Sequence, residues 1–354
     1  MSVIIFIIIL SALIIVHELG HFLVARKFGI RVDEFGLGFP PRARKLFTWK
    51  GTPFTLNWLP FGGFVKIFGE NPEQSTSNAP SDSFQSKSRG IQASVLLAGV
   101  LGNFIFAWSL ISIGFIVGLP TPAGLSIPIE NPRTVITTVL PDSPAALAGL
   151  KSGDAILSLD GHVVSPEEAV ILIGESSEPI TFEIERGGAI SSRVVEPKEG
   201  IIADKPAVGI TMDVIGIAKL TPHKAIWQGL ETASELTLLT GQGILSFLSE
   251  SFRGKADLSG ITGPVGIVGL VGEARELGFT YLLTFTALIS INLTIINLLP
   301  FPALDGGRLL FVGIEALTRR PVSARIFNTV NVIGFALLLL LMLVVTVQDI
   351  RNIF

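Results

Sequence analysis

The 354-residue chain contains no cysteine, which excludes disulfide bridges and thiolate metal ligands. Charged residues are also scarce, at 16% of the chain, while hydrophobic residues reach 49% and the mean hydropathy is +0.63. Ordinary soluble domains carry about 25% charged residues. The composition therefore argues against a soluble enzyme and favours a membrane protein.

Four segments are long and apolar enough to cross the ~30 Å hydrocarbon core of a bilayer. They cover residues 3–25, 94–119, 281–299 and 326–347. The first segment lacks the basic start and small-residue cleavage site of a secretory signal peptide, so we expect it to be retained. The predicted fold class is a multi-pass α-helical membrane protein with about four transmembrane helices.

Histidine is rare as well, and two of the four histidines lie inside the first apolar segment. His17 and His21 are four residues apart, so a helix places both imidazoles on one face. Glu18 lies near enough to touch a metal-bound water without ligating the metal. This H-E-x-x-H spacing is that of zinc peptidases, in which the histidines bind Zn²⁺ and the glutamate is the general base. The other two, His162 and His223, lie in polar stretches and are expected to be solvated.

The alternative interpretation of this motif is a polar cluster that faces a helix bundle, with its histidines bonded to main-chain carbonyls. An ionisable side chain at membrane depth costs roughly 2.5–3.5 kcal/mol on insertion scales, so such groups are rare there without a function. Three of them occur here within five residues. We therefore favour a metal site.

A tetrahedral zinc site needs a third protein ligand. Asp305 is the candidate, because it follows the apolar run 281–299 directly. Pro300 and Pro302 interrupt the helix there, and Gly306-Gly307 is expected to let the backbone turn away after the ligand. The alternative is that Asp305 caps the next helix.

Lysine and arginine are distributed unevenly between the loops. Residues 25–92 contain ten of them against five Asp and Glu, whereas the section between the second and third apolar segments contains eleven against twenty. Cytoplasmic loops carry the excess of Lys and Arg in membrane proteins. We therefore expect the first and third loops inside, both termini and the long acidic section outside, and the metal site toward the cytoplasmic side.

Two motifs together resemble the site-2 protease family of bacterial intramembrane zinc metalloproteases, in its single-PDZ form. They are H-E-x-x-H at 17–21 and N-x-x-P-x-P-x-L-D-G-G at 297–307. Further stretches resemble family segments in the same order along the chain: 36–39, 60–66, 102–104 and 263–267. The resemblance implies one Zn²⁺ cofactor, with His17, His21 and Asp305 as metal ligands and Glu18 as the catalytic base.

The resemblance also implies a set of substrate-binding residues. Asn292 and Asn297 match asparagines thought to help hold the substrate main chain near the metal. The segment between the first two spans is expected to form membrane-associated β-hairpins. Gly62 and Gly63 would let the substrate backbone approach there and pair as a strand, although simple turn glycines are an equal alternative.

The outward section alternates short β-rich runs with turn signals over residues 130–200. Its stretch S-P-A-x-x-A-G-L-x-x-G-D-x-I at 143–156 resembles a circularly permuted bacterial PDZ domain, an α+β fold inserted outside the cytoplasm. A PDZ domain binds an extended peptide or chain end as an added strand. A rigid steric plug without a ligand is the alternative.

The chain is therefore expected to divide into four parts. Residues 1–120 form an N-terminal membrane core, 128–212 the PDZ domain, 213–278 amphipathic juxtamembrane helices, and 279–354 a C-terminal membrane core. Within the third part, residues 225–248 are predicted to form one amphipathic helix that lies on the membrane surface.

The expected function is zinc-dependent intramembrane endopeptidase activity, by metal-activated water with Glu18 as the base. The resemblance implies a bacterial plasma (inner) membrane location and single-span membrane protein substrates that are already trimmed outside, such as anti-sigma factors, or remnant signal peptides. The lipid bilayer is a further partner, and no nucleic-acid partner is expected. A transporter and a catalytically inactive membrane PDZ scaffold are the alternatives; the transporter is disfavoured by the absence of an internal repeat.

Overall fold

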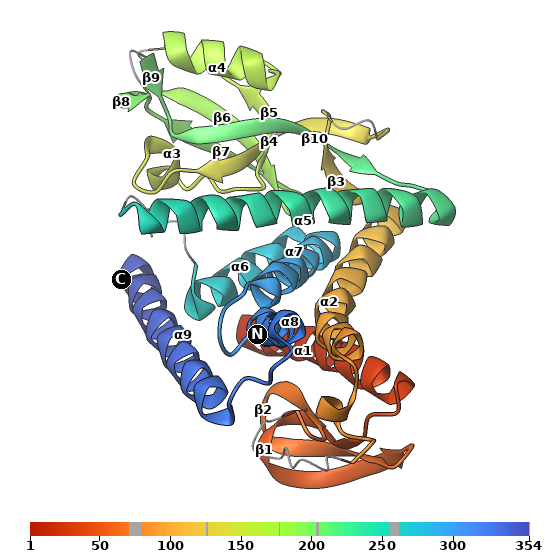
Figure 1. Cartoon of the computed structure of the whole chain (residues 1–354). Coiled ribbons are helices and arrows are strands. Elements are labelled where there is room, and N and C mark those ends of the chain that lie inside the picture. The colour runs from red at the N-terminus through yellow and green to blue at the C-terminus, as the bar shows by residue number, and fades with distance from the viewer. Residues whose placement is uncertain (71–79, 125–126, 177, 203–204, 255–261, 354) are drawn as a thin grey trace. The chain divides into compact units, whose positions relative to one another are not determined.

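The computed structural model describes the chain except for residues 71–79, 125–126, 177, 203–204, 255–261 and 354. Contacts between Cα atoms divide the chain into two compact units (Figure 1). The helical unit comprises Met1–Ile111, Ile226–Gly272 and Thr284–Phe354. The sheet unit comprises Ser112–Ala225 and Glu273–Leu283.

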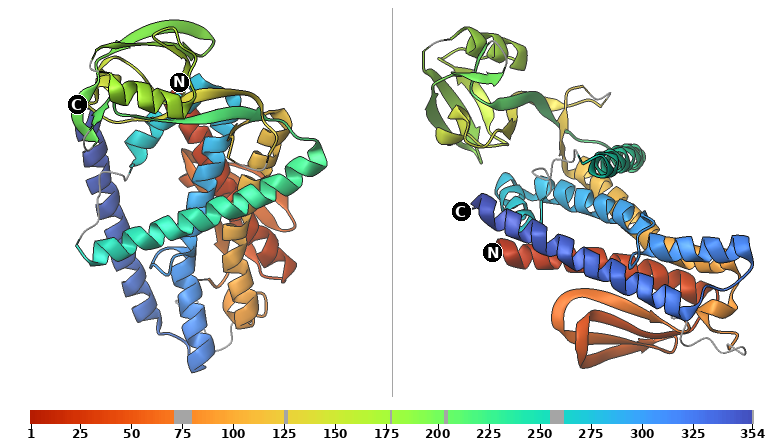
Figure 2. Two further views of the ribbon diagram at one scale, coloured as in Figure 1. Left: turned by 90° about the horizontal axis from the view of Figure 1, so that it is seen from above. Right: turned by 60° about the vertical axis from the view of Figure 1, so that its left-hand side comes forward.

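Four helices are long and apolar enough to cross a membrane: α1 (Ser2–Lys27), α2 (Arg89–Val117), α7 (Phe279–Leu298) and α9 (Ala324–Ile353). They lie roughly alongside one another in both views of Figure 2. The prediction of four spans, and with it the fold class, is confirmed among the described residues. Each observed helix is longer than the apolar segment that predicted it, because helical hydrogen bonding continues into flanking residues.

Helices α1 and α2 pack with their backbones very close together. A Cβ on Gly20 would collide with the Ala98 carbonyl, and one on Gly102 would lie 2.9 Å from the Val16 carbonyl oxygen. Small residues at a crossing let helices approach in this way inside a membrane, where no hydrophobic effect drives them together. The close crossing sets which face of α1 meets α2, and that face carries the two histidines.

A long antiparallel hairpin, β1 (Val32–Trp49) and β2 (Thr52–Ile67), follows α1. The fully buried Phe22 of α1 packs edge-on against Phe35 and Phe54 of the hairpin, with ring centroids 5.7 and 5.4 Å apart. Aromatic pairs at these distances contribute beyond simple area burial. The hairpin is therefore held firmly against the helix that carries H-E-x-x-H.

The amphipathic helix expected at 225–248 is present as α5 (Pro222–Phe252), and α6 (Pro264–Leu277) follows it. The Asp349 carboxylate of α9 accepts the main-chain N–H groups of Gly263 and Gly266, at 3.0 and 2.8 Å. The first N–H groups of a helix have no partner within the helix. The close approach of this carboxylate explains why glycine stands at positions 263 and 266.

The helix α8 (Asp305–Thr318) begins at the predicted third ligand. The expectation that Gly306 and Gly307 turn the chain away after Asp305 was wrong, because both lie in the first turn of α8. A Cβ on Gly306 would collide with the Leu298 and Leu299 carbonyls. The glycines instead let the start of α8 pack against the preceding connection, which fixes the place of Asp305.

The sheet unit is built on a six-stranded antiparallel sheet in the order β3-β10-β4-β5-β6-β7. Its core includes the fully buried Ile136, Phe182 and Ile184. The strands are β3 (Leu119–Pro122), β4 (Glu130–Val139), β5 (Ala155–Leu159), β6 (Ile180–Arg186), β7 (Ala189–Val195) and β10 (Ile210–Ala218). A separate pair, β8 (Lys198–Ile202) and β9 (Lys205–Ala207), and two helices, α3 (Pro144–Leu147) and α4 (Pro166–Glu175), complete it.

An ion pair between the buried Asp154 and the partly exposed Arg186 stabilises this sheet. The Asp154 carboxylate is fully buried and accepts hydrogen bonds from Arg186 Nε at 2.5 Å, Arg186 Nη2 at 2.7 Å and the Lys151 main-chain N–H at 2.9 Å. Hydrogen bonding to Asp154 raises the pKa of the Arg186 guanidinium. Both oxygens of this buried carboxylate therefore accept hydrogen bonds from within the protein.

Candidate metal centre

The two histidines of α1 face the same point. His17 Nε2 and His21 Nε2 lie 3.1 Å apart, and the rings meet edge to face with centroids 4.7 Å apart. Their spacing of four residues on a helix produces this arrangement. His21 is only 6% exposed and the His17 side chain 12% exposed, so the pair is shielded from solvent.

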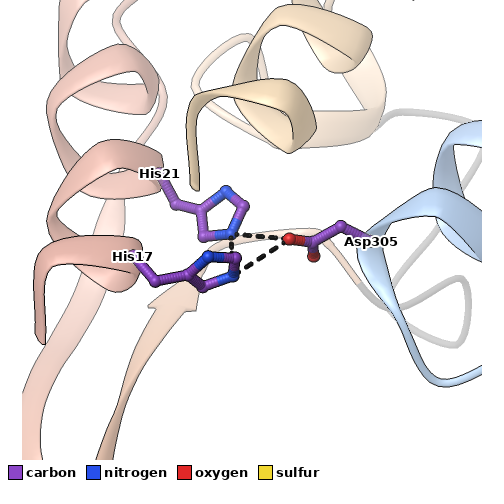
Figure 3. Close-up of side chains that lie close together, drawn as sticks. All are labelled: His17, His21 and Asp305. Carbon is purple, nitrogen blue, oxygen red and sulfur yellow. Dashed lines mark hydrogen bonds and ion pairs between the residues drawn. The ribbon is translucent and has the colours of Figure 1, made fainter. Parts of the chain in front are cut away.

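Asp305 meets the histidine pair from α8, 284 residues after His21 (Figure 3). Its Oδ2 lies 3.0 Å from His17 Nε2 and 3.1 Å from His21 Nε2. The residue at the N-cap of α8 is Leu304, and no side chain caps this helix. Asp305 therefore points at the histidines and does not act as the helix cap.

The separations of these three atoms are within about 0.4 Å of those that a tetrahedral zinc ion requires. Ligand atoms held at 2.0–2.1 Å from zinc in tetrahedral geometry are about 3.3–3.4 Å apart. The three observed separations are 3.0–3.1 Å. The Asp305 Oδ2 is also buried without a hydrogen-bond partner among the described residues. Two imidazole nitrogens and one carboxylate oxygen are a donor set of catalytic zinc sites, so these residues fit the ion.

Glu18 lies beside the three but makes a different contact. Its Oε2 accepts the main-chain N–H of Val65 at 2.8 Å, from strand β2. The side chain is half-buried. The hairpin backbone thus holds the glutamate in place next to the histidine pair.

One face of α2 forms a wall of the site. Residues 102–104 resemble a family segment, but sequence reasoning did not place them beside the histidines. The Val95 carbonyl accepts from His21 Nδ1 at 2.8 Å. A Cβ on Gly99 would collide with His21 Nε2 and lie 2.8 Å from His17 Cε1. The fully buried Asn103 side chain lies 3.4 Å from His17 Nδ1. A spacing of four residues from 95 to 99 to 103 was the available signal, but only the helix crossing shows that this face meets the histidines.

The predicted substrate residues come from other elements than the three ligands, namely α7 and β2. Asn292 is exposed on α7, and Asn297 is half-buried near the end of that helix. Gly62 has a left-handed backbone with φ of 80°, and a Cβ there would lie 3.2 Å from Ile14 Cδ1. A Cβ on Gly63 would lie 3.0 Å from the Gly36 carbonyl. Both glycines are buried, and close packing within the protein accounts for their small size.

A membrane protein with four candidate spans and a two-histidine, one-carboxylate cluster beside a glutamate belongs to the class of membrane metallopeptidases. Comparison with known families agrees. The model of peptidase family M50 matches residues 5–341, and the chain belongs to this family.

Curated relatives cover nearly the whole chain. The chain is 32% identical to the zinc metalloprotease RasP of Geobacillus kaustophilus, over 100% of this chain and 98% of the relative. It is 29% identical to the regulator of sigma-E protease RseP of Escherichia coli, over 95% of each. It is 28% identical to the zinc metalloprotease RasP of Oceanobacillus iheyensis, over 100% and 99%. The expectation of a membrane zinc metalloprotease of the site-2 protease family is confirmed.

Proposed function

We propose that this chain is an intramembrane endopeptidase that holds one Zn²⁺ between His17, His21 and Asp305. The observation that carries the proposal is the convergence of three ligand atoms at 3.0–3.1 Å from one another, contributed by two helices far apart in sequence. Asp305 Oδ2 supports it, because this buried oxygen faces only the two imidazole nitrogens and has no hydrogen-bond donor among the described residues. Burying such a carboxylate oxygen is costly unless a cation faces it.

The chemistry divides between the ion and the chain. When bound, zinc supplies Lewis-acid polarisation of the scissile carbonyl and makes water nucleophilic near neutral pH. Glu18 accepts the proton of the attacking water and then donates it to the leaving amine nitrogen. The Val65 N–H holds Oε2 of Glu18, which leaves Oε1 to carry the proton. The buried histidine pair limits the access of bulk water to the reacting groups.

The substrates are proposed to be single-span membrane proteins already shortened outside, such as anti-sigma factors, or remnant signal peptides. The name of the Escherichia coli relative, regulator of sigma-E protease, supports the first class. A helical substrate has its main-chain groups paired internally, so it must unwind before cleavage. Asn292 and Asn297 of α7, together with the strand at Gly62 and Gly63, would offer replacement main-chain contacts. Alanine at Asn297 that leaves turnover of a model substrate unchanged would contradict this role.

Residues 128–212 are proposed to act as a PDZ domain outside the cytoplasm. Strand β10 pairs with β4 from Ile210 onward but with β3 only from Ile215, so its first half has an open edge among the described strands. An extended peptide or chain end can add to such an edge. The other possibility is a size filter without a peptide ligand.

The proposed orientation places the basic segment 25–92 in the cytoplasm and the PDZ domain outside. Because the chain has no cysteine, single cysteines can be introduced and labelled with a reagent that does not cross the membrane. Labelling of a cysteine within 25–92 from outside would show that the orientation is the opposite one.

The zinc content of the full-length protein tests the central proposal. We expect about one zinc per chain in the wild type and loss of that zinc in Asp305→Ala. Asp349→Ala is the matched control. It also removes a shielded aspartate, but one whose carboxylate accepts the main-chain N–H groups of Gly263 and Gly266. A wild type without zinc would favour the transporter or inactive scaffold. Full zinc in a folded Asp305→Ala protein would exclude Asp305 as a ligand.

A further inference from the structure

The inner face of α2 contacts both histidines at their Nδ1 atoms. His21 donates from Nδ1 to the Val95 carbonyl at 2.8 Å, which turns its Nε2 toward Asp305. Metal-binding histidines usually donate their second ring N–H to a carbonyl or carboxylate, and this bond fixes the tautomer and the orientation of the ring. His21 thus already has its outer partner, provided by the main chain.

The corresponding partner of His17 is Asn103, two turns further along α2. The Asn103 side chain is fully buried, and its Nδ2 lies 3.4 Å from His17 Nδ1. Its Oδ1 has no hydrogen-bond partner among the described residues. With a cation at Nε2, the His17 ring carries its hydrogen on Nδ1, and an amide NH₂ facing it would set donor against donor.

Rotating the Asn103 carboxamide by 180° exchanges its oxygen and nitrogen without changing its shape. The oxygen then accepts the His17 Nδ1–H, and the orphaned acceptor gains a partner in the same movement. We propose that Asn103 is a positioning residue, which holds the His17 ring with Nε2 toward the metal through an Nδ1–H···Oδ1 hydrogen bond. This inference rests on the metal site proposed above.

A purely structural role of residue 103 can be tested separately from the contact between its side chain and His17. The contact that ties α2 to α7 at this point uses the main-chain carbonyl of Asn103, which accepts from Ser290 Oγ at 2.8 Å. Any residue at position 103 keeps that carbonyl. Ser290→Ala removes the interhelical bond and leaves His17 untouched, so it is the matched control.

The test is the zinc affinity of the full chain in detergent, measured by competition with a chromophoric chelator. Asn103→Ala should weaken zinc binding by about 10–100-fold, the range for loss of an outer partner of a metal-binding histidine. Asn103→Asp restores an acceptor and should stay within a few-fold of the wild type. Ser290→Ala should bind zinc as the wild type does. The visible spectrum of the Co²⁺-substituted protein should change in Asn103→Ala but not in Ser290→Ala.

Each other outcome overturns the inference. Wild-type affinity in Asn103→Ala, while Asp305→Ala loses zinc, would refute the positioning role and leave the proposed function intact. Equal losses in Asn103→Ala, Asn103→Asp and Ser290→Ala would show that only packing matters. Absence of zinc from the wild type would refute both proposals. If Asn103→Ala fails to fold, Asn103→Leu fills the same space without an acceptor and carries the same expectation.

Discussion

Each unit contains an aspartate with a buried carboxylate oxygen, and the surroundings of the two oxygens are opposite. In the sheet unit, Asp154 is surrounded by donors from Arg186 and from the Lys151 main chain. In the helical unit, Asp305 Oδ2 faces two imidazole nitrogens and has no hydrogen-bond partner among the described residues. Asp154 is complete within the protein, whereas Asp305 is arranged for something that the protein does not supply.

The difference follows from the cost of burying charge. An ionised carboxylate loses several kcal/mol of hydration on burial unless partners replace the water. A guanidinium and a main-chain N–H do so permanently for Asp154, which suits a structural role. Histidine nitrogens can ligate a cation together with a carboxylate, which suits a site that is loaded. A buried carboxylate with all its hydrogen bonds made thus indicates a structural role. A carboxylate that lacks hydrogen-bond donors and lies beside histidines indicates a metal-binding role.

The largest expected effect separates catalysis from metal binding within the helical unit. Glu18→Gln keeps the size of the side chain but removes the base, so cleavage of a model transmembrane substrate should fall by about 10²–10⁴-fold. Zinc content should stay at the wild-type level, because Glu18 is not among the three converging ligands. Glu231→Gln, an exposed glutamate of α5, is the control and should cleave normally. Retained turnover in Glu18→Gln would end the peptidase proposal.

A second substitution acts on the space around the site. Gly99→Ala places a methyl group against both histidine rings, so we expect zinc affinity to fall by at least about 10–100-fold. Gly90→Ala, in the same helix with no atom near its Cβ position, should bind zinc normally. Chelator competition on the two purified proteins checks this. Equal affinities would mean that α2 can move away and does not form a rigid wall.

Substitution of Asp154 in the sheet unit should lower stability and leave zinc binding unchanged. Asp154→Ala leaves Arg186 without its partner, and we expect the sheet unit to lose about 2–3 kcal/mol of folding stability. The loss should be smaller than for a fully buried ion pair, because Arg186 is a third exposed. Faster proteolysis within residues 112–225 on heating would report the loss, while zinc content should not change. The exposed Asp213→Ala is the control. Zinc loss in Asp154→Ala would contradict the separation of the two roles.

The mildest expected effect concerns substrate choice. Deletion of residues 130–200 leaves every proposed ligand in place, so cleavage of a trimmed substrate should persist. Substrates with bulky outer domains should now be cut without prior trimming. A deleted form that binds zinc, cleaves the trimmed substrate and still rejects the untrimmed one would rule out a filtering role for the sheet unit.

Much of this arrangement was predictable from local patterns. The four spans follow from apolar run length, and the facing histidines follow from a spacing of four in a helix. Asp305 was identifiable as a candidate because its chemistry matched what the histidines lacked. These inferences need only residue type and spacing.

What could not be predicted depends on how helices cross. Gly99 and Asn103 reach the histidines only because Gly20 and Gly102 bring α1 and α2 into close contact. The same limit explains the error at Gly306, whose role is the close approach of α8 to the chain before it. The sequence alone does not show which segment of backbone approaches a given glycine.

The bond between Glu18 and strand β2 has a genetic consequence. Its donor is the main-chain N–H of residue 65, which nineteen of the twenty amino acids possess. Exhaustive replacement of that side chain would leave the bond available in every variant except proline. A mutational scan at this position would therefore report only how the Val65 side chain packs against the core around Phe22, and it would miss the main-chain bond to the proposed catalytic glutamate.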